Sequence, residues 1–232
     1  MAPVNGMDTY SCPDPDIMSW LRNHGNFRII CFYLRHTHQE PDASWSCSAR
    51  STLAANGWGF FPTYGALRAE NPNLNPASGA NDGQDAVNKM RGVGFADGGV
   101  IYLDIETGGA PNAAYISYIS AWVSKVRALN FIPAIYGPYT TIQWARGYAP
   151  ALTDIFWSAN PTPGTHGQAY DPNNLPPASI DPGCIATQYR QGVTLDGLTI
   201  PPSVDTEGLD LNLSLVADPS NAAVVQHALS VA

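Results

Sequence analysis

The sequence predicts an α/β protein built as a single (β/α)₈ barrel of the TIM type. Short apolar segments alternate with amphipathic segments along most of the chain, which is typical of strands joined by helical crossovers. About eight apolar segments follow one another, and eight parallel strands close most simply into a barrel. The chain has 232 residues, enough for one such barrel, and no linker or internal repeat divides it. We therefore expect one barrel domain over residues 1–232.

In the first half of the chain, each expected strand is followed by a helical or loop segment. The strands are expected at 4–8, 27–34, 59–65 and 98–109, and the helices at 13–25, 49–56 and 79–95. Asp14 or Asp16 can cap the first of these helices. Pro15 suits its first turn, and Gly25 ends it. Segment 27–34 is apolar throughout, as in strands that are buried on both faces of a parallel sheet.

The second half continues the alternation, with fewer helices toward the end. The strands are expected at 131–137, 154–160 and 184–190 and within 204–215, and the helices at 112–130 and 138–148. Pro and Gly dominate the connections after the sixth and seventh strands, so we expect short or missing helices there. Because loops of barrels carry function, we expect the long loop 160–182 to shape the substrate site.

Composition excludes several classes of protein. The chain is 44% hydrophobic and 13% charged, so it can bury a large core. Its net charge of −8 and lack of a basic run exclude nucleic acid as the main partner. No apolar run approaches the ~20 residues of a membrane span. The start "MAPVNGMDTY" encodes no secretory signal peptide, which leaves a removed signal, another export route or an internal protein. We expect a monomer without a cofactor.

The cysteines do not form a metal-binding pattern. Cys12, Cys31, Cys47 and Cys184 lack CxxC spacing, so we expect no zinc site. Cys31 lies in an apolar segment and is expected to be a small buried hydrophobe. Cys12 and Cys47 lie on the loops after the first and second strands, which are neighbours in a barrel. We expect them to be close, with free thiols favoured over a disulfide.

The stretch "GGVIYLDIETGG" carries the strongest candidate site. Ile101, Leu103 and Ile105 share one face of the expected strand, because side chains alternate along a strand. Asp104 and Glu106 share the opposite face, with Cα atoms roughly 6–7 Å apart. Two carboxylates this close raise one another's pKa, which suits a general acid. A solvated strand end or a cation site is the alternative interpretation of the pair.

Two further acids are expected at the same end of the barrel. Asp8 ends the first expected strand, and Asp210 ends the last one. The first and last strands are neighbours in a closed barrel, and the fourth strand faces them across the mouth. A mouth that gathers Asp8, Asp104, Glu106 and Asp210 is costly unless the acids work together.

Short motifs in a fixed order support this interpretation. "GMD", "YLDIET", "PAIYG", "FWSAN" and "TQY" followed by "LDLN" resemble the glycoside hydrolase family 25 lysozymes, which are (β/α)₈ muramidases. The chain resembles more closely a related group, the Rv2525c-like glycoside-hydrolase-like domain, or domain of unknown function 1906. That group pairs a Gly-x-Asp start with a "G…DA…A" helix, here "GQDAVNKMRGVG" before "IYLDIE". The resemblance covers residues from about 5 to 215.

The resemblance implies roles for individual residues. Glu106 would be the catalytic acid/base and Asp104 its electrostatic partner. Asp8 and Asp210 would be supporting carboxylates in the mouth. Asp205 also lies in the "VDTEGLDLN" segment, but "LDLN" favours Asp210 as the matching residue.

The same resemblance implies a sugar site. Tyr136, Trp157 and Gln188 would line it. Tyr64 is a further aromatic side chain that could stack on a sugar ring, although such rings are often part of the core.

Three functions compete at this point. The leading one is a glycoside hydrolase acting on an N-acetylated cell-wall glycan, with peptidoglycan as the expected substrate and the cell wall as the place of action after secretion or delivery. The alternative is a catalytically weak or inactive barrel that serves as a carbohydrate- or cell-wall-binding module. An intracellular metal-dependent hydrolase would need ligands beyond His36, His38 and Asp42. Such a histidine pair is more often a polar rim, so we expect no metal.

Overall fold

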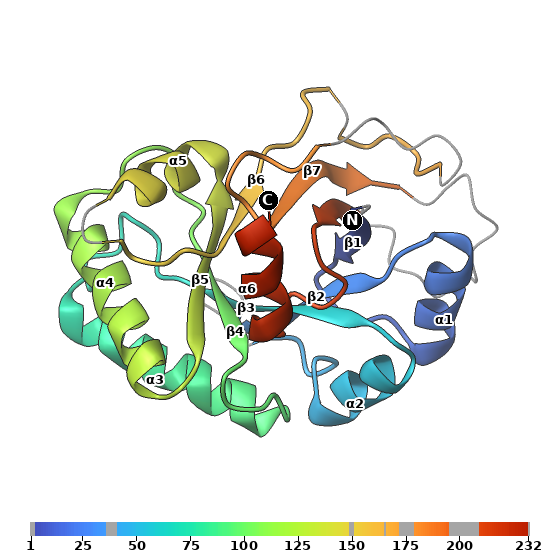
Figure 1. Cartoon of the computed structure of the whole chain (residues 1–232), viewed down its shortest axis with the longest axis horizontal. Helices are drawn as coiled ribbons and strands as arrows, with labels where there is room; N and C mark the ends of the chain where they lie inside the picture. Colours follow the sequence, from blue (N-terminus) through green and yellow to red (C-terminus); the bar gives the residue numbers. More distant parts are fainter. Residues whose placement is uncertain are drawn as a thin grey trace.

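The computed structural model shows a closed barrel of eight strands in the order β1 to β8 (Figure 1). It describes residues 3–35, 41–148, 151–164, 166–171, 179–194 and 209–231. The strands are β1 (Val4–Asp8), β2 (Ile29–Arg35), β3 (Gly59–Gly65), β4 (Val100–Asp104), β5 (Ile132–Pro138), β6 (Phe156–Ala159), β7 (Ala186–Val193) and β8 (Leu209–Ser214). The helices are α1 (Pro15–His24), α2 (Cys47–Ala55), α3 (Pro76–Gly92), α4 (Ala113–Ala128), α5 (Tyr139–Gly147) and α6 (Ala222–Val231). The predicted α/β barrel is confirmed.

One strand departs from the expected all-parallel arrangement. Neighbouring strands from β1 to β7 are parallel. β8 is antiparallel to both β7 and β1. Leu209 at the start of β8 pairs with Val193 at the end of β7, so the chain runs back along the barrel instead of crossing over to its other end. Asp210 therefore lies near the beginning of its strand, and not at its end as expected.

The alternation predicted for the fourth strand is confirmed. Ile101 and Leu103 belong to the apolar cluster between the barrel and its helices. Tyr102 belongs to the cluster inside the barrel, where it packs edge-on against Phe61 and Trp157. The barrel interior is thus a packed core, as in other small barrels, and leaves only its ends open to ligands.

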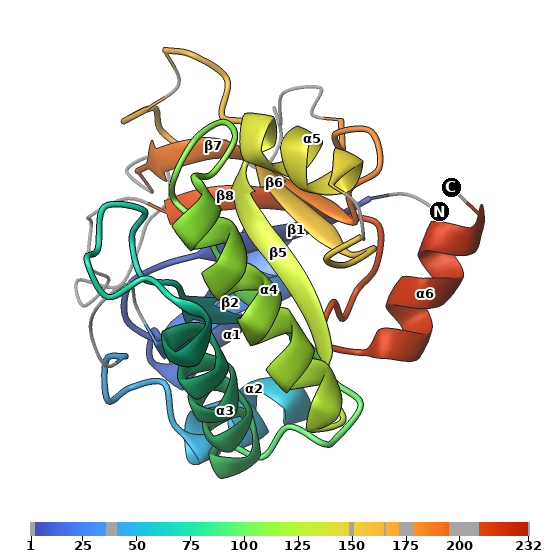
Figure 2. The ribbon, with the colours of Figure 1, turned by 90° about the vertical axis from the view of Figure 1, so that its left-hand side faces the viewer.

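Helices α3 and α4 pack side by side against one flank of the barrel (Figure 2). α3 begins at Pro76, before the expected start at 79, because Asn75 caps it. The Asn75 side chain accepts a hydrogen bond from Ser78 N at 3.0 Å, and Ser78 Oγ accepts one from Asn75 N at 3.1 Å. Gly79 lets the helices approach closely, because a Cβ there would lie 2.2 Å from the carbonyl oxygen of Tyr118.

A loop takes the place of a helix on the far flank. In the described residues between β6 and β8 there is no helix, in agreement with the sequence. Tyr170 covers this side: it stacks on Phe27 with ring centroids 5.0 Å apart, and its hydroxyl donates to the carbonyl of Gly25. This described part of the loop, which we expected to shape the substrate site, packs on the outside of the barrel through Tyr170.

The C-terminal helix closes one end of the barrel. Val225 and Ala228 of α6 join the inner cluster beside Val100 and Ile155, which lie at or before the starts of their strands. The hydroxyl of Tyr102 donates to the carbonyl of Pro219 at 3.1 Å and ties the preceding segment to the barrel. The opposite end, where the parallel strands finish, is left for a ligand.

All four cysteines are free thiols. The loops after β1 and β2 are in contact, as expected, because Cys12 N donates to Ser44 Oγ at 2.8 Å. Cys31 is buried, with its Sγ 3.0 Å from Thr63 Oγ1. Within the part of the chain that the structure describes, no helix combines the length and apolar character needed to cross a membrane.

Candidate active site

A cavity of about 310 Å³ opens at the end of the barrel where the parallel strands finish. Its lining is acidic and aromatic, and consists of Asp8, Tyr33, Asp104, Ile105, Glu106, Tyr136, Gly137, Pro138, Ala159, Gln188, Gln191 and Asp210. The carboxylates that the sequence placed at the mouth are all in this lining. Tyr136 and Gln188, which the resemblance placed at the sugar site, are there too.

Asp8 is a buried acid held by a ring of donors. Its carboxylate accepts hydrogen bonds from Gln188 Nε2 and Asn212 Nδ2, both at 3.0 Å, and from the Tyr33 hydroxyl at 3.3 Å. Burial raises its pKa to about 7, and the charge of Asp210 adds to the rise, while the hydrogen bonds oppose it. Desolvation outweighs the donors, so Asp8 titrates near neutral pH.

Gln188 connects the acids of the first and last strands, Asp8 and Asp210. Its Nε2 donates to Asp8 and, at 3.2 Å, to Asp210. Its Oε1 accepts from the Tyr136 hydroxyl at 3.0 Å and from Gln191 Nε2 at 2.8 Å. These contacts fix the amide with its nitrogen toward the acids. Burial also raises the pKa of Asp210, while its hydrogen bond from the backbone of Gly192 opposes the rise.

Asp104 is the last residue of β4 and stands beside Tyr136 of β5 in the barrel register. Its Oδ1 is buried and has no hydrogen-bond partner among the described residues. Burial raises its pKa to about 8, with further contributions from the charges of Glu106 and Asp8, while Arg68 opposes the rise. Asp104 therefore holds a proton at neutral pH, with an oxygen left for a ligand.

Glu106 lies beyond the strand, on the loop between β4 and α4. Its side chain is 49% exposed and pairs with Arg68, whose Nη2 lies 3.2 Å from Glu106 Oε2. Its charge adds to the raised pKa of Asp104, which is the carboxyl group removed from water.

The model of the family described as Rv2525c-like, glycoside hydrolase-like domain matches residues 19–205. The chain belongs to this family. No curated protein matches the chain.

Solved structures share the fold of this Rv2525c-like domain. An uncharacterized protein from B. stearothermophilus is 22% identical over 91% of this chain and 95% of that chain, with a TM-score of 0.62. The Tat-secreted protein Rv2525c of Mycobacterium tuberculosis, solved with L-tartrate, is 17% identical over 92% of this chain and 95% of that one, with a TM-score of 0.61. The autolysin LytC of Streptococcus pneumoniae, solved with a synthetic peptidoglycan ligand, is 10% identical, with a TM-score of 0.59; the match covers 91% of this chain and 46% of LytC.

Trp157, expected to line the sugar site, lies beneath the cavity. It is only 1% exposed and sandwiched between Phe61 and Tyr136, with ring centroids 4.2 and 4.0 Å away. Its Nε1 donates to Asn212 Oδ1 at 3.0 Å, and Asn212 in turn donates to Asp8. In this Rv2525c-like domain Trp157 supports the floor of the cavity and does not line it.

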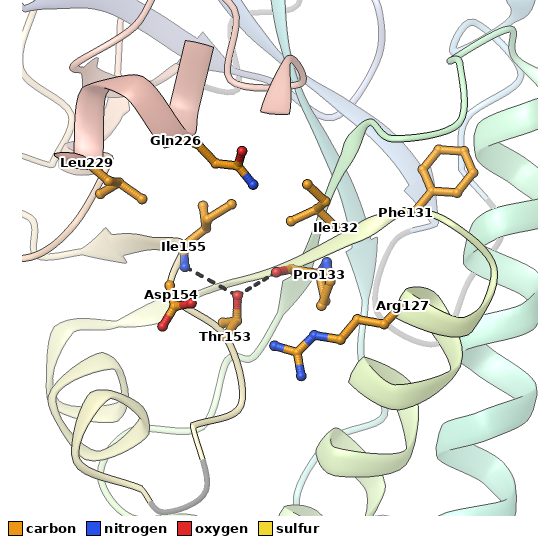
Figure 3. A pocket seen from close by; sticks show the side chains of 9 residues that line it. All are labelled: Arg127, Phe131, Ile132, Pro133, Thr153, Asp154, Ile155, Gln226 and Leu229. Carbon is orange, nitrogen blue, oxygen red and sulfur yellow. Dashed lines mark hydrogen bonds between the residues drawn. The ribbon is translucent and has the colours of Figure 1, made fainter. Parts of the chain in front are cut away.

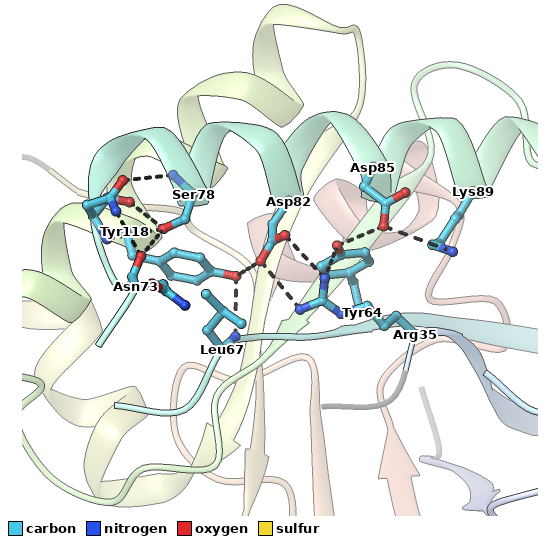
Figure 4. Close-up of polar contacts among 10 residues, drawn as sticks. Arg35, Tyr64, Leu67, Asn73, Ser78, Asp82, Asp85, Lys89 and Tyr118 are labelled. Atoms are coloured by element: carbon cyan, nitrogen blue, oxygen red, sulfur yellow. Dashed lines mark hydrogen bonds and ion pairs between the residues drawn. The ribbon is translucent and has the colours of Figure 1, made fainter. Parts of the chain in front are cut away.

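Tyr64 also lies away from the cavity, on the outer side of the barrel toward α3 (Figure 4). It is fully buried. Its hydroxyl donates to Asp85 Oδ2 at 2.9 Å and accepts from Arg35 Nη1 at 2.6 Å. A ring in this position cannot stack on a sugar, because β3 turns it outward into the contact with the helix.

Several residues of the site were not singled out in the sequence. Asn212 lies two residues after Asp210, on the same face of β8, so strand alternation could have found it. Tyr33 could have been found in the same way on β2. Arg68 lies on a loop, where no periodicity applies, and nothing in the sequence links it to Glu106.

A second cavity, of about 230 Å³, lies among α4, β5, the segment just before β6 and α6 (Figure 3). Asp154 is the single carboxylate in its described lining, and the guanidinium of Arg127 donates to the carbonyl of Leu152 at 2.7 Å. The hydroxyl of Thr153 donates to the carbonyl of Pro133 at 2.5 Å. Without an acid pair, this cavity offers no comparable chemistry.

The described residues also include no group of three or more His, Cys, Asp or Glu side chains that could hold a metal ion. Of the metal ligands considered from the sequence, His36 and His38 lie outside the described residues. Asp205, the alternative to Asp210, also lies outside them. Asp42 is described, and its Oδ1 accepts a hydrogen bond from Ser44 N at 2.7 Å.

Proposed function

We propose that this Rv2525c-like domain is a glycoside hydrolase that cleaves an N-acetylated cell-wall glycan, with peptidoglycan as its substrate. The observation that carries the proposal is the buried, unpartnered Oδ1 of Asp104 in an acidic cavity beside Glu106. A buried polar atom without a partner is costly, so a ligand that fills the cavity should supply one. The N–H of a 2-acetamido group is a donor that every N-acetylated sugar offers.

Glu106 is the proposed proton donor. It stands at the open side of the cavity, where a glycosidic oxygen can approach, whereas Asp104 lies deeper. When the acetamido N–H binds Asp104, the ionised form of Asp104 is stabilised, and the proton that burial holds there can pass to Glu106. Glu106 then protonates the leaving oxygen as the bond from that oxygen to the sugar C1 breaks.

The acetamido group is the proposed nucleophile. Its carbonyl oxygen attacks C1 as the leaving group departs, and the ionised carboxylate of Asp104 holds the N–H and balances the charge that develops. A water molecule then attacks C1, the bond from C1 to the acetamido oxygen breaks, and the water gives a proton to Glu106. When the product leaves, this proton returns to Asp104, which restores the starting state. This substrate-assisted route retains the configuration at C1 without a covalent bond to the protein.

The remaining residues of the cavity bind the sugar. The network of Asp8, Gln188 and Asp210 presents fixed acceptors on the side of the barrel opposite β4. Sugar hydroxyl groups are donors that suit such acceptors. Tyr136 provides an aromatic side chain in the same lining. We place the action of the protein at the cell wall. This is in keeping with Rv2525c, a protein of similar fold that is Tat-secreted.

A carbohydrate-binding module without activity is the second candidate. The ion pair between Glu106 and Arg68 favours it, because a carboxylate in an ion pair must leave that pair before it can carry a proton. The two candidates agree on the ligand and differ in whether a bond is cleaved.

The test is a zymogram on purified bacterial cell walls, followed by analysis of the reducing ends released. The wild-type protein should clear the wall and release sugar reducing ends, and the Glu106→Gln variant should not. Wall binding without any new reducing ends would overturn the hydrolase and leave the binding module.

A further inference from the structure

Arg68 is a basic side chain at the rim of an acidic cavity. The described lining of the cavity contains Asp8, Asp104, Glu106 and Asp210 but no Lys, Arg or His. Arg68 forms an ion pair with Glu106 of this lining, in which the two side chains are 54% and 49% exposed. An anionic ligand that enters this mouth would meet an acidic lining, with the guanidinium of Arg68 beside Glu106 on the rim.

The backbone on both sides of Arg68 is anchored, although its side chain is half in solvent. Leu67 N donates to the hydroxyl of Tyr118 at 3.4 Å (Figure 4). The carbonyl of Ala69 accepts from Asn112 Nδ2 at 3.3 Å. The loop thus holds the backbone that carries Arg68 at a defined place on the rim, which favours recognition of a particular ligand group.

Glu106 occupies the position in which Arg68 would bind a carboxylate from a ligand. A guanidinium binds carboxylates through directed, charge-assisted hydrogen bonds. The present pair is exposed on both sides, and exposed ion pairs contribute little to stability, so a competing carboxylate can replace Glu106 at low cost.

We propose that Arg68 binds a carboxylate carried by the glycan, and that this carboxylate displaces Glu106 from Arg68. The inference rests on the proposed function and adds to it a substrate class: N-acetylated glycans with a carboxylate on a sugar next to the scissile bond. The lactyl carboxylate of N-acetylmuramic acid is such a group. Glu106, once released, is free to take up a proton and reach the glycosidic oxygen. A neutral glycan leaves Glu106 in the ion pair.

A binding experiment tests the first half of the inference without any cleavage. The wild-type protein is titrated with N-acetylmuramic acid and with N-acetylglucosamine, and binding is followed by NMR. N-acetylmuramic acid should bind more tightly, and Arg68→Met should weaken its binding about tenfold while leaving N-acetylglucosamine unchanged, the size expected for one charge-assisted hydrogen bond. Equal affinities in the wild type, or an unchanged preference in Arg68→Met, would overturn the proposal.

Arg91→Met is the matched control. Arg91 is also a half-exposed arginine in an ion pair, with its Nε 2.9 Å from Asp97 Oδ1, and it lies near the end of α3 away from the cavity. The variant makes the same change in net charge and should keep the wild-type preference. If Arg91→Met loses the preference as Arg68→Met does, the effect comes from net charge and the proposal is wrong.

Kinetics test the second half. Oligosaccharides that contain N-acetylmuramic acid are compared with neutral N-acetylglucosamine oligosaccharides. Arg68→Met should cleave the acidic substrate at least about tenfold more slowly and the neutral one at least as fast as the wild type, because Glu106 is no longer held. A purely structural Arg68 would lower both rates alike, which would overturn the inference. If the wild type cleaves neither substrate, the proposed hydrolase fails, and the binding experiment still decides the role of Arg68.

Discussion

Asp8 and Asp210 stand opposite each other in register across the antiparallel pair of β1 and β8, and one amide nitrogen, Gln188 Nε2, lies 3.0 Å from an oxygen of the first and 3.2 Å from an oxygen of the second. The reversal of β8 creates this relationship. A parallel β8 would carry Asp210, near its start, to the end of the barrel that α6 closes. The reversed strand brings it to the mouth.

Gln188→Met tests the bridge between the acids. Met has a similar length but no amide, so the variant leaves Asp8 and Asp210 without a shared donor. We expect it to lower the free energy of unfolding by roughly 1–3 kcal/mol at pH 7, as for other unsatisfied buried groups. Because the hydrogen bond from Gln188 lowers the pKa of Asp8, that pKa should also rise. Chemical denaturation and NMR titration measure the two effects.

Gln191→Met is the control for this variant. Gln191 is partly exposed and donates to Gln188 without contacting either acid in the described network, so its loss should cost less than the loss of Gln188. Equal costs for the two variants would contradict the bridging role.

The pH dependence of stability should carry the signature of buried acids. Burial raises the pKa values of Asp8 and Asp104 in the folded state to about 7 and about 8, above the usual carboxyl value of 3.8. Between about pH 4 and pH 8 the folded state binds more protons than the unfolded state. The contribution of these acids to folding stability is therefore complete below about pH 4 and is lost as the pH rises to 8. Asp104→Asn should flatten this decline and be more stable than the wild type at pH 8, by at least roughly 2 kcal/mol.

Asp97→Asn is the comparison of opposite sign. The hydrogen bond from Arg91 lowers the pKa of this exposed carboxyl group, so its contribution is present above pH 4 and lost in acid. The decline toward pH 8 should therefore remain in Asp97→Asn. Urea denaturation at a series of pH values separates the two variants, and a decline as steep in Asp104→Asn as in the wild type would refute the assignment.

The sequence was informative for strands whose two faces lie in different environments. β4 has the core of helices on one side and the barrel interior on the other, so the alternation of Ile101 and Leu103 with Tyr102 and Asp104 could be predicted. The position of Asp8 at the mouth followed from the short strand that it ends.

Where both faces of a strand are buried, the alternation does not show which side chains point into the barrel. Every residue of β3 is buried, so nothing in its pattern distinguishes Thr63, which faces Cys31 inside the barrel, from Tyr64, which faces α3. The direction of β8 was likewise hidden, because a strand reads as the same alternation from either end. The ion pair of Arg68 with Glu106 joins two loops and has no local signal in the sequence.

The contact between α3 and α4 predicts opposite effects for two glycines of one helix. Gly79→Ala should destabilise the fold by roughly 1–3 kcal/mol, because the added Cβ meets the carbonyl of Tyr118 and the helices must separate. Gly92→Ala should be neutral or stabilising by up to about 1 kcal/mol, since no other atom lies within 4 Å of its added Cβ and Ala favours helix. Thermal unfolding of the two variants measures the difference. Equal melting temperatures would contradict the close packing at Gly79.

The chemistry of the site is tested by removing one carboxylate at a time. Glu106→Gln should lower the rate of glycan cleavage at least ~10²-fold, the usual contribution of a general acid, with the fold intact because the side chain is half-exposed. Asp104→Asn should show a comparable loss and move the acidic limb of the pH–rate profile, because one of two coupled carboxyl groups no longer titrates. Glu70→Gln makes the same chemical change on a neighbouring exposed loop residue outside the cavity lining, and should keep wild-type activity. Steady-state rates on a glycan that the wild type demonstrably cleaves decide the matter. If Glu106→Gln retains the wild-type rate on that glycan, Glu106 is not the proton donor and the proposed mechanism is wrong.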